Sequence, residues 1–66
     1  MLLHINGEER RLDGVTTIAS LILKLGLESK KVAIERNLEI VPRSTYAHTD
    51  LADGDRIEIV AFIGGG

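Results

Sequence analysis

The chain of 66 residues contains no cysteine and no tryptophan, and it has only one proline, one tyrosine and one phenylalanine. The absence of cysteine excludes a disulfide framework, a thiolate metal site and a thiol nucleophile. A basic surface is lacking as well, because 10 acidic residues stand against 8 basic ones and give a net charge of −2. Since nucleic-acid-binding modules usually carry a basic stripe, we expect no nucleic-acid partner.

Long apolar runs are also missing. The longest uninterrupted one, Ile59–Ile63, is far shorter than the roughly 20 residues of a membrane-spanning helix. The first residues, Met-Leu-Leu-His, lack the basic start and apolar core of a signal peptide. His4 and His48 lie far apart and show neither metal-ligand spacing nor a local triad motif. We expect a cytoplasmic domain that binds no metal and no membrane.

Aliphatic residues, in contrast, are plentiful. Leucine, isoleucine and valine make up about a third of the chain, which is enough for one compact core and argues against disorder. A domain of this size buries only about 60% of its unfolded surface, so little room remains for an enclosed active site. The composition therefore favours a carrier, a binding domain or a protein modifier over an enzyme.

Alternation of apolar and polar residues predicts the strands. They are expected over 1–6, 8–12, 31–36, 40–41 and 56–63. Asn6-Gly7 is a strong hairpin signal, because both central residues of such a turn need positive φ. Asn37 suits a second tight turn, and Asp53 and Asp55 are interpreted as turn residues around a glycine rather than as a carboxylate pair.

A helical period separates the second and third strands. Apolar residues at Ile18, Leu21, Ile22 and Leu25 form one face of a helix. We expect Thr17 to cap its start. Gly26 suits its end, and Leu23, off the apolar stripe, is expected to be partly exposed. Ser44 is predicted to cap a single helical turn later in the chain, with Tyr46 packing beneath that loop and Leu51 anchoring the core.

This order of elements predicts an α+β fold, with one main helix packed on a four- to five-stranded mixed sheet. It suggests the ubiquitin-like β-grasp, in which the last strand is central and parallel to the first. We expect a β-grasp domain over residues 1–63 and a flexible tail over residues 64–66, and we expect the free protein to be a monomer.

The second half of the chain carries a family resemblance. Its motifs are Val-Ala-Ile-Glu-Arg-Asn at 32–37, Ile-Val-Pro-Arg-Ser at 40–44, Asp-Gly-Asp at 53–55 and Phe-Ile-Gly-Gly-Gly at 62–66. Taken together, they resemble the ThiS family of sulfur carrier proteins in thiamine biosynthesis. The likeness covers the whole chain, with one departure: Leu38 stands where the family often has glycine.

The resemblance implies that the backbone carboxylate of Gly66 is the reactive group. An E1-like adenylyltransferase would adenylate it with ATP, and sulfur from a cysteine desulfurase or persulfide carrier would convert it to a thiocarboxylate. Thiazole synthase would receive that sulfur. No resident cofactor is implied, and the chain itself is not an enzyme. Gly64 and Gly65, which lack a Cβ atom, would let the tail enter a narrow channel in these partners.

The last predicted strand offers a handle beside this tail. If its alternation holds, Val60 and Phe62 lie on the sheet face opposite the core, and together with Ile63 they are candidate partner-binding residues. Arg43 and Arg56 are interpreted mainly as solvated surface charges.

Three other functions remain open at this stage. The chain resembles less closely a sulfur carrier of another pathway, such as the small subunit of molybdopterin synthase. A ubiquitin-like modifier would use the same adenylation but end in an isopeptide bond to lysine. A small autonomous enzyme is the third alternative, and the sequence shows no pocket residues for it.

Overall fold

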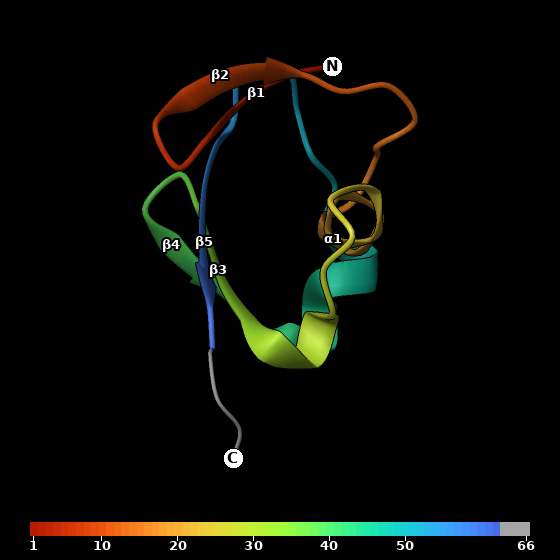
Figure 1. Cartoon of the computed structure of the whole chain (residues 1–66), viewed down its shortest axis with the longest axis vertical. Coiled ribbons are helices and arrows are strands. Elements are labelled where there is room, and N and C mark those ends of the chain that lie inside the picture. The colour runs from red at the N-terminus through yellow and green to blue at the C-terminus, as the bar shows by residue number, and fades with distance from the viewer. Residues whose placement is uncertain (63–66) are drawn as a thin grey trace.

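The computed structural model describes residues 1–62 and shows a five-stranded sheet with a single α-helix on one side (Figure 1). The strands are β1 (Leu2–Ile5), β2 (Glu8–Arg11), β3 (Val32–Arg36), β4 (Glu39–Val41) and β5 (Arg56–Ala61). Their spatial order is β2-β1-β5-β3-β4. β5 is central, parallel to β1 and antiparallel to β3. The α+β, β-grasp prediction is confirmed.

The β1–β2 hairpin turns at Asn6 and Gly7, which have φ values of 50° and 84°. Positive φ at both positions is what an Asn-Gly hairpin turn requires. β2 ends at Arg11, one residue before the predicted end, and all four of its residues are exposed. Its charged side chains suit an edge strand, where they discourage pairing with another chain.

Helix α1 (Ile18–Lys24) begins and ends as the sequence predicts. Thr17 Oγ1 accepts a hydrogen bond from the backbone N–H of Ser20, and Ser20 Oγ accepts one from the N–H of Thr17. At the other end Gly26 has a φ of 73°, and Gly26 and Leu27 donate backbone bonds back into the last turn. This arrangement satisfies the free carbonyl groups of the helix end.

Two short 3-10 helices, η1 (Ser29–Lys31) and η2 (Arg43–His48), complete the elements. The predicted cap at Ser44 is wrong, since η2 starts directly after Pro42 with no side-chain cap. The Pro42 carbonyl instead accepts from both the N–H and the hydroxyl of Thr45. Pro42 suits the position just before η2, because its ring fixes φ at a value that this position accepts.

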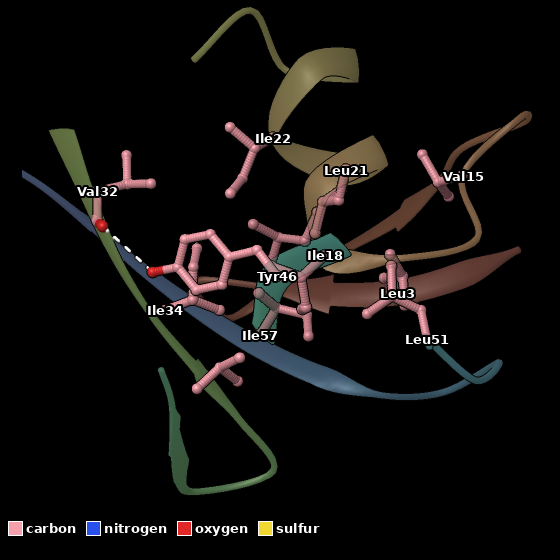
Figure 2. Close-up of a cluster of buried hydrophobic side chains, with 12 residues drawn as sticks. Leu3, Val15, Ile18, Leu21, Ile22, Val32, Ile34, Tyr46, Leu51 and Ile57 are labelled. Atoms are coloured by element: carbon pink, nitrogen blue, oxygen red, sulfur yellow. Dashed lines mark hydrogen bonds between the residues drawn. The ribbon is translucent and has the colours of Figure 1, made fainter. Parts of the chain in front are cut away.

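The core lies between α1 and the inner face of the sheet (Figure 2). Its buried hydrophobic residues are Leu3, Ile5, Val15, Ile18, Leu21, Ile22, Val32, Ile34, Val41, Tyr46, Leu51 and Ile57. The hydroxyl of Tyr46 donates to the Val32 carbonyl at 3.3 Å, so the one aromatic ring of this core is satisfied at its polar end (Figure 2). Tyr46 and Leu51 thus lie where the sequence predicted.

β5 stops at Ala61 instead of continuing to Ile63 as predicted. Its end and the N-terminus of the chain lie at opposite ends of the molecule (Figure 1). The predicted boundary between residues 63 and 64 lies outside the described residues. Within residues 1–62, no helix is long and apolar enough to cross a membrane.

Candidate functional site

The end of β5 presents apolar side chains on the outer face of the sheet, which is the face turned away from α1. Ile57 is completely buried on the inner face, whereas Val60 and Phe62 are 60% and 55% exposed. Phe62 donates its backbone N–H to the Lys31 carbonyl at 2.7 Å, which holds this end of the chain against η1. The predicted orientation of Val60 and Phe62 is confirmed.

The other predicted site residues, Ile63, Gly64, Gly65 and Gly66, lie outside the described residues. Covalent geometry alone limits how far these four residues reach, to roughly 13–14 Å when fully extended. Any chemistry at Gly66 therefore takes place within that distance of Phe62.

Three neighbouring strands contribute to the surface beside Phe62. In the β3–β5 ladder Ala33 lies opposite Val60 and Glu35 opposite Glu58, and β4 places Ile40 opposite Glu35. We call these five residues the outer patch. They and Ile34 line a shallow hollow of about 150 Å³. Ile40 is 79% exposed, so it adds apolar area to this surface.

Asn6 supports β5 from its other side. Its side-chain amide donates to the Ile59 carbonyl at 3.2 Å, and its side-chain oxygen accepts from the Ile59 N–H at 2.7 Å. These two bonds continue the β1–β5 ladder past the point where the β1 backbone turns away. The hairpin signal in the sequence did not reveal this second role, which fixes the strand that leads to the tail.

Asp55 is the main structural residue that the sequence interpretation missed. It is 7% exposed, and its carboxylate accepts from Arg36 Nε at 2.8 Å, from Asn37 Nδ2 at 3.0 Å and from the Ala52 N–H at 2.8 Å. Burial raises the pKa of this carboxyl, but the bonds from Ala52, Asn37 and Arg36 outweigh burial and leave the pKa below its ordinary value of 3.8. Asp55 is thus a buried junction between β3 and β5, and not simply a turn residue.

Arg43 is exposed, as predicted, but its side chain also has a structural role. Its Nε donates to the Ser29 carbonyl at 3.0 Å and its Nη2 donates to the Val32 carbonyl at 3.4 Å. The side chain therefore ties η2 to η1 and to the start of β3. Arg56 is exposed, as predicted.

Within residues 1–62 no group of three His, Cys, Asp or Glu residues is placed to hold a metal ion. A hollow of about 460 Å³ lies beside the end of α1. It is lined by Ala19, Ile22, Leu23, Leu27, Glu28, Ser29 and Lys30. These residues include a hydroxyl and a carboxylate but no histidine or cysteine, and the exposed Leu23 forms one wall.

A family model now places this geometry among known proteins. The model of the ThiS family matches residues 3–66, which is nearly the whole chain. The chain belongs to the ThiS family.

Relatives of similar length support the assignment to the ThiS family. The sulfur carrier protein ThiS of Bacillus subtilis is 42% identical over 66 residues, a match covering 98% of this chain and all of that protein. The crystal structure of the thiamine biosynthesis protein ThiS of Geobacter metallireducens is 32% identical. It superposes with a TM-score of 0.84 and covers both chains completely.

Longer relatives contain a ThiS-like region as one part of a larger chain. A thiazole synthase of Paramagnetospirillum magneticum is 59% identical over 66 residues, and one of Magnetococcus marinus is 46% identical. The present chain spans 20% of the length of each. In these two proteins the ThiS-like region and the rest of the thiazole synthase are covalently joined.

The departure at Leu38 has a structural consequence within the ThiS fold. Asn37 and Leu38 both have positive φ, at 51° and 71°, so the β3–β4 turn keeps the conformation that glycine favours. Asn37 is held by Asp55, whereas Leu38 is 81% exposed. A leucine at positive φ costs conformational energy, and here no burial offsets the cost.

Proposed function

We propose that this ThiS-family chain is a sulfur carrier for thiamine biosynthesis and that the backbone carboxylate of Gly66 carries the sulfur. The observation that carries the proposal is the end-to-end similarity to the sulfur carrier ThiS of Bacillus subtilis. The Gly-Gly-Gly sequence at residues 64–66 supports it, because no turn or core pattern of the fold requires those glycines.

The proposed chemistry proceeds with Gly66 as the terminal residue of the reacting chain. The carboxylate oxygen attacks the α-phosphate of ATP in an E1-like adenylyltransferase, and pyrophosphate leaves. A persulfide sulfur then attacks the acyl carbon and displaces AMP. A thiol cleaves the resulting S–S bond, which leaves a thiocarboxylate on Gly66. Adenylation is needed because a carboxylate is a poor electrophile with no good leaving group.

Thiazole synthase is the proposed acceptor of the sulfur. The two relatives in which a ThiS-like region belongs to a thiazole synthase chain support this partnership. The sulfur itself comes from a cysteine desulfurase or a persulfide carrier. In this proposal the chain acts as a cosubstrate and holds no cofactor of its own. The reactions take place in the cytoplasm, and the free carrier is a monomer.

The domain acts as the handle that presents the tail. Val60 and Phe62 offer exposed apolar area within reach of the reactive group, and Ile63 continues the same segment. Aromatic side chains that become fully desolvated often dominate a binding energy. We assign Val60, Phe62 and Ile63 to partner binding, with Gly64 and Gly65 as the narrow lead into the partner's channel.

Intact-mass analysis tests the proposal directly. The chain is incubated with ATP, the E1-like adenylyltransferase of its own organism and a persulfide donor. Replacement of one carboxylate oxygen by sulfur should raise the mass by the difference between the two atoms. Matched reactions without ATP, and with Gly66 deleted, should give no increase, although the deletion should leave thermal stability unchanged.

An unchanged mass with a competent enzyme and donor contradicts the carrier function. Conjugates of the chain with other proteins on a denaturing gel favour a ubiquitin-like modifier instead. One experiment distinguishes the two results, because a thiocarboxylate leaves the chain unconjugated, whereas an isopeptide bond joins it to another protein.

A further inference from the structure

We propose that Glu35 and Glu58 bind a cationic side chain of the E1-like adenylyltransferase. The aliphatic stem of that side chain packs on the apolar residues of the outer patch. This inference depends on the proposed function for the identity of the enzyme. It adds which residues of the domain the enzyme recognises and which charge the enzyme must present to them.

The register of β3 and β5 places the two glutamates directly opposite each other. Phe62 donates to the Lys31 carbonyl, and Asn37 donates to the Arg56 carbonyl, at the two ends of this antiparallel ladder. Hydrogen-bonded pairs therefore fall at every second position, and Glu35–Glu58 is one of them. Side chains paired in this way have Cβ atoms about 4.5–5.5 Å apart and share one face of the sheet.

Like charges in this position destabilise a sheet. Within residues 1–62 the ion pairs are Glu28 with Lys31 and Arg36 with Asp55, so neither glutamate of the outer patch forms an ion pair. Arg56 and His4 line a hollow with Glu58, but neither is joined to it by an ion pair. Arg36, adjacent to Glu35 in sequence, points to the opposite face and is held by Asp55. The folded domain thus retains a repulsion that no ion pair of the described residues relieves and that a single cation from outside can relieve.

The apolar members of the outer patch match the shape of such a cation. Ile40 and Val60 are both exposed, and with Ala33 they border the 150 Å³ hollow beside the two carboxylates. Arginine and lysine lay an aliphatic stem on apolar surface while the charged end binds oxygen atoms. Arginine fits two neighbouring carboxylates best, because its guanidinium carries five donors in a rigid plane.

The adenylyltransferase is the partner that needs this surface even where thiazole synthase does not. In the two long relatives, the ThiS-like region is already joined to thiazole synthase, and a covalent link supplies a high effective concentration without a strong docking surface. A separate adenylating enzyme has no such link and must recognise the domain through its surface. The outer patch adjoins Phe62, from which the tail reaches the enzyme's active site.

The test compares four variants of the full chain in which glutamine replaces glutamate. Glu35→Gln and Glu58→Gln, alone and combined, remove charge from the outer patch at nearly constant shape. Glu9→Gln removes one charge from β2, two strands from β5 across the sheet, and is the control for net charge that matches each single variant. Calorimetric titration with the E1-like adenylyltransferase gives Kd at low and high salt, and thermal unfolding gives Tm.

We expect opposite effects on stability and on binding. Loss of the repulsion should raise Tm by about 1–5 °C in the outer-patch variants. The double variant should bind about tenfold more weakly and with less dependence on salt, since a charge-assisted bond is lost. Glu9→Gln should change Kd and Tm little, which separates local recognition from general electrostatic attraction.

Two results overturn the inference. Equal Kd values for the wild type and the double variant show that the glutamates do not contact the enzyme. Equal weakening by Glu9→Gln shows that only net charge matters. Failure of the proposed function is distinguishable from both, because in that case even the wild type gains no thiocarboxylate in the intact-mass experiment.

Discussion

The two faces of the sheet use the same central strand in opposite ways. On the inner face of β5, Ile57 is fully buried beneath α1, while three residues further on Val60 lies mostly in solvent on the outer face. The inner face joins an aliphatic core, and within residues 1–62 no buried side-chain nitrogen or oxygen lacks a hydrogen-bond partner. Stability is therefore concentrated on one face, and the end of β5 on the other face stays exposed.

Carboxylates show the same contrast. On the side where the strand begins, Asp55 is buried and accepts three hydrogen bonds. On the outer face Glu35 and Glu58 are exposed and lie opposite each other, and neither forms an ion pair in the described part of the chain. A buried acid must be satisfied for the domain to fold, whereas an exposed pair tolerates an unfavourable arrangement that a partner can relieve.

The largest expected effect separates the two faces on one strand. Ile57→Ala should lower the free energy of unfolding by about 2–5 kcal/mol, because it leaves a cavity under α1. Val60→Ala should cost well under 1 kcal/mol, since its side chain is already exposed. Chemical denaturation of both variants measures the difference. Similar losses would show that the outer face contributes to the core.

Asp55→Asn should have the next largest effect. It removes the charge that pairs with Arg36. It also replaces one acceptor oxygen by an NH2 group, which cannot accept a hydrogen bond from Arg36, Asn37 or Ala52. We expect a loss of about 1–3 kcal/mol in the free energy of unfolding at neutral pH. Glu58→Gln is the matched control on the outer face, where loss of a carboxylate should stabilise instead.

The pH dependence of stability offers a second measurement on Asp55. Its pKa is lower in the folded domain than the ordinary value of 3.8, so the unfolded chain binds the proton more tightly. The stability that Asp55 contributes is therefore complete above the ordinary value and is lost as the pH falls through the folded pKa. The wild type should lose more stability than Asp55→Asn between pH 5 and strongly acidic pH. Parallel acid profiles would contradict this assignment.

A smaller effect is expected at the edge of the sheet. Leu38→Gly should raise the free energy of unfolding by about 0.5–1 kcal/mol, because glycine adopts positive φ without strain. The β1–β2 hairpin provides the reverse experiment, since Gly7 has a φ of 84° in the equivalent position after Asn6. Gly7→Ala should destabilise by a similar amount. A loss of stability in Leu38→Gly would mean that the leucine side chain stabilises the turn.

Local signals predicted much of this fold. Thr17, Gly26 and the Asn6-Gly7 pair act on backbone groups a few residues away, so their sequence neighbours reveal their roles. The outward orientation of Val60 and Phe62 also followed from simple alternation along one strand. Such features need no knowledge of the tertiary structure.

Other roles depend on residues that are distant in the sequence. Asp55 binds Arg36 and Asn37, which lie 19 and 18 positions away, and Arg43 binds Ser29, 14 positions away. The sequence alone therefore predicted only a turn residue at Asp55 and a surface charge at Arg43. The opposition of Glu35 and Glu58 likewise requires the register of two strands. The sequence also extended β5 to Ile63, because apolar alternation continues past the last backbone pairing at Ala61.

Phe62→Ala should have the smallest effect on stability and a clear effect on docking. The side chain is more than half exposed and its backbone bond to Lys31 survives, so the free energy of unfolding should change by no more than about 0.5 kcal/mol. Adenylation at limiting carrier concentration should nevertheless slow several-fold, as expected for an aromatic anchor beside the tail. Leu23→Ala changes an apolar residue of α1 that is even more exposed than Phe62, and as the control it should leave the rate unchanged. Equal adenylation kinetics in Phe62→Ala and the wild type would show that the enzyme recognises the tail without this end of the outer face.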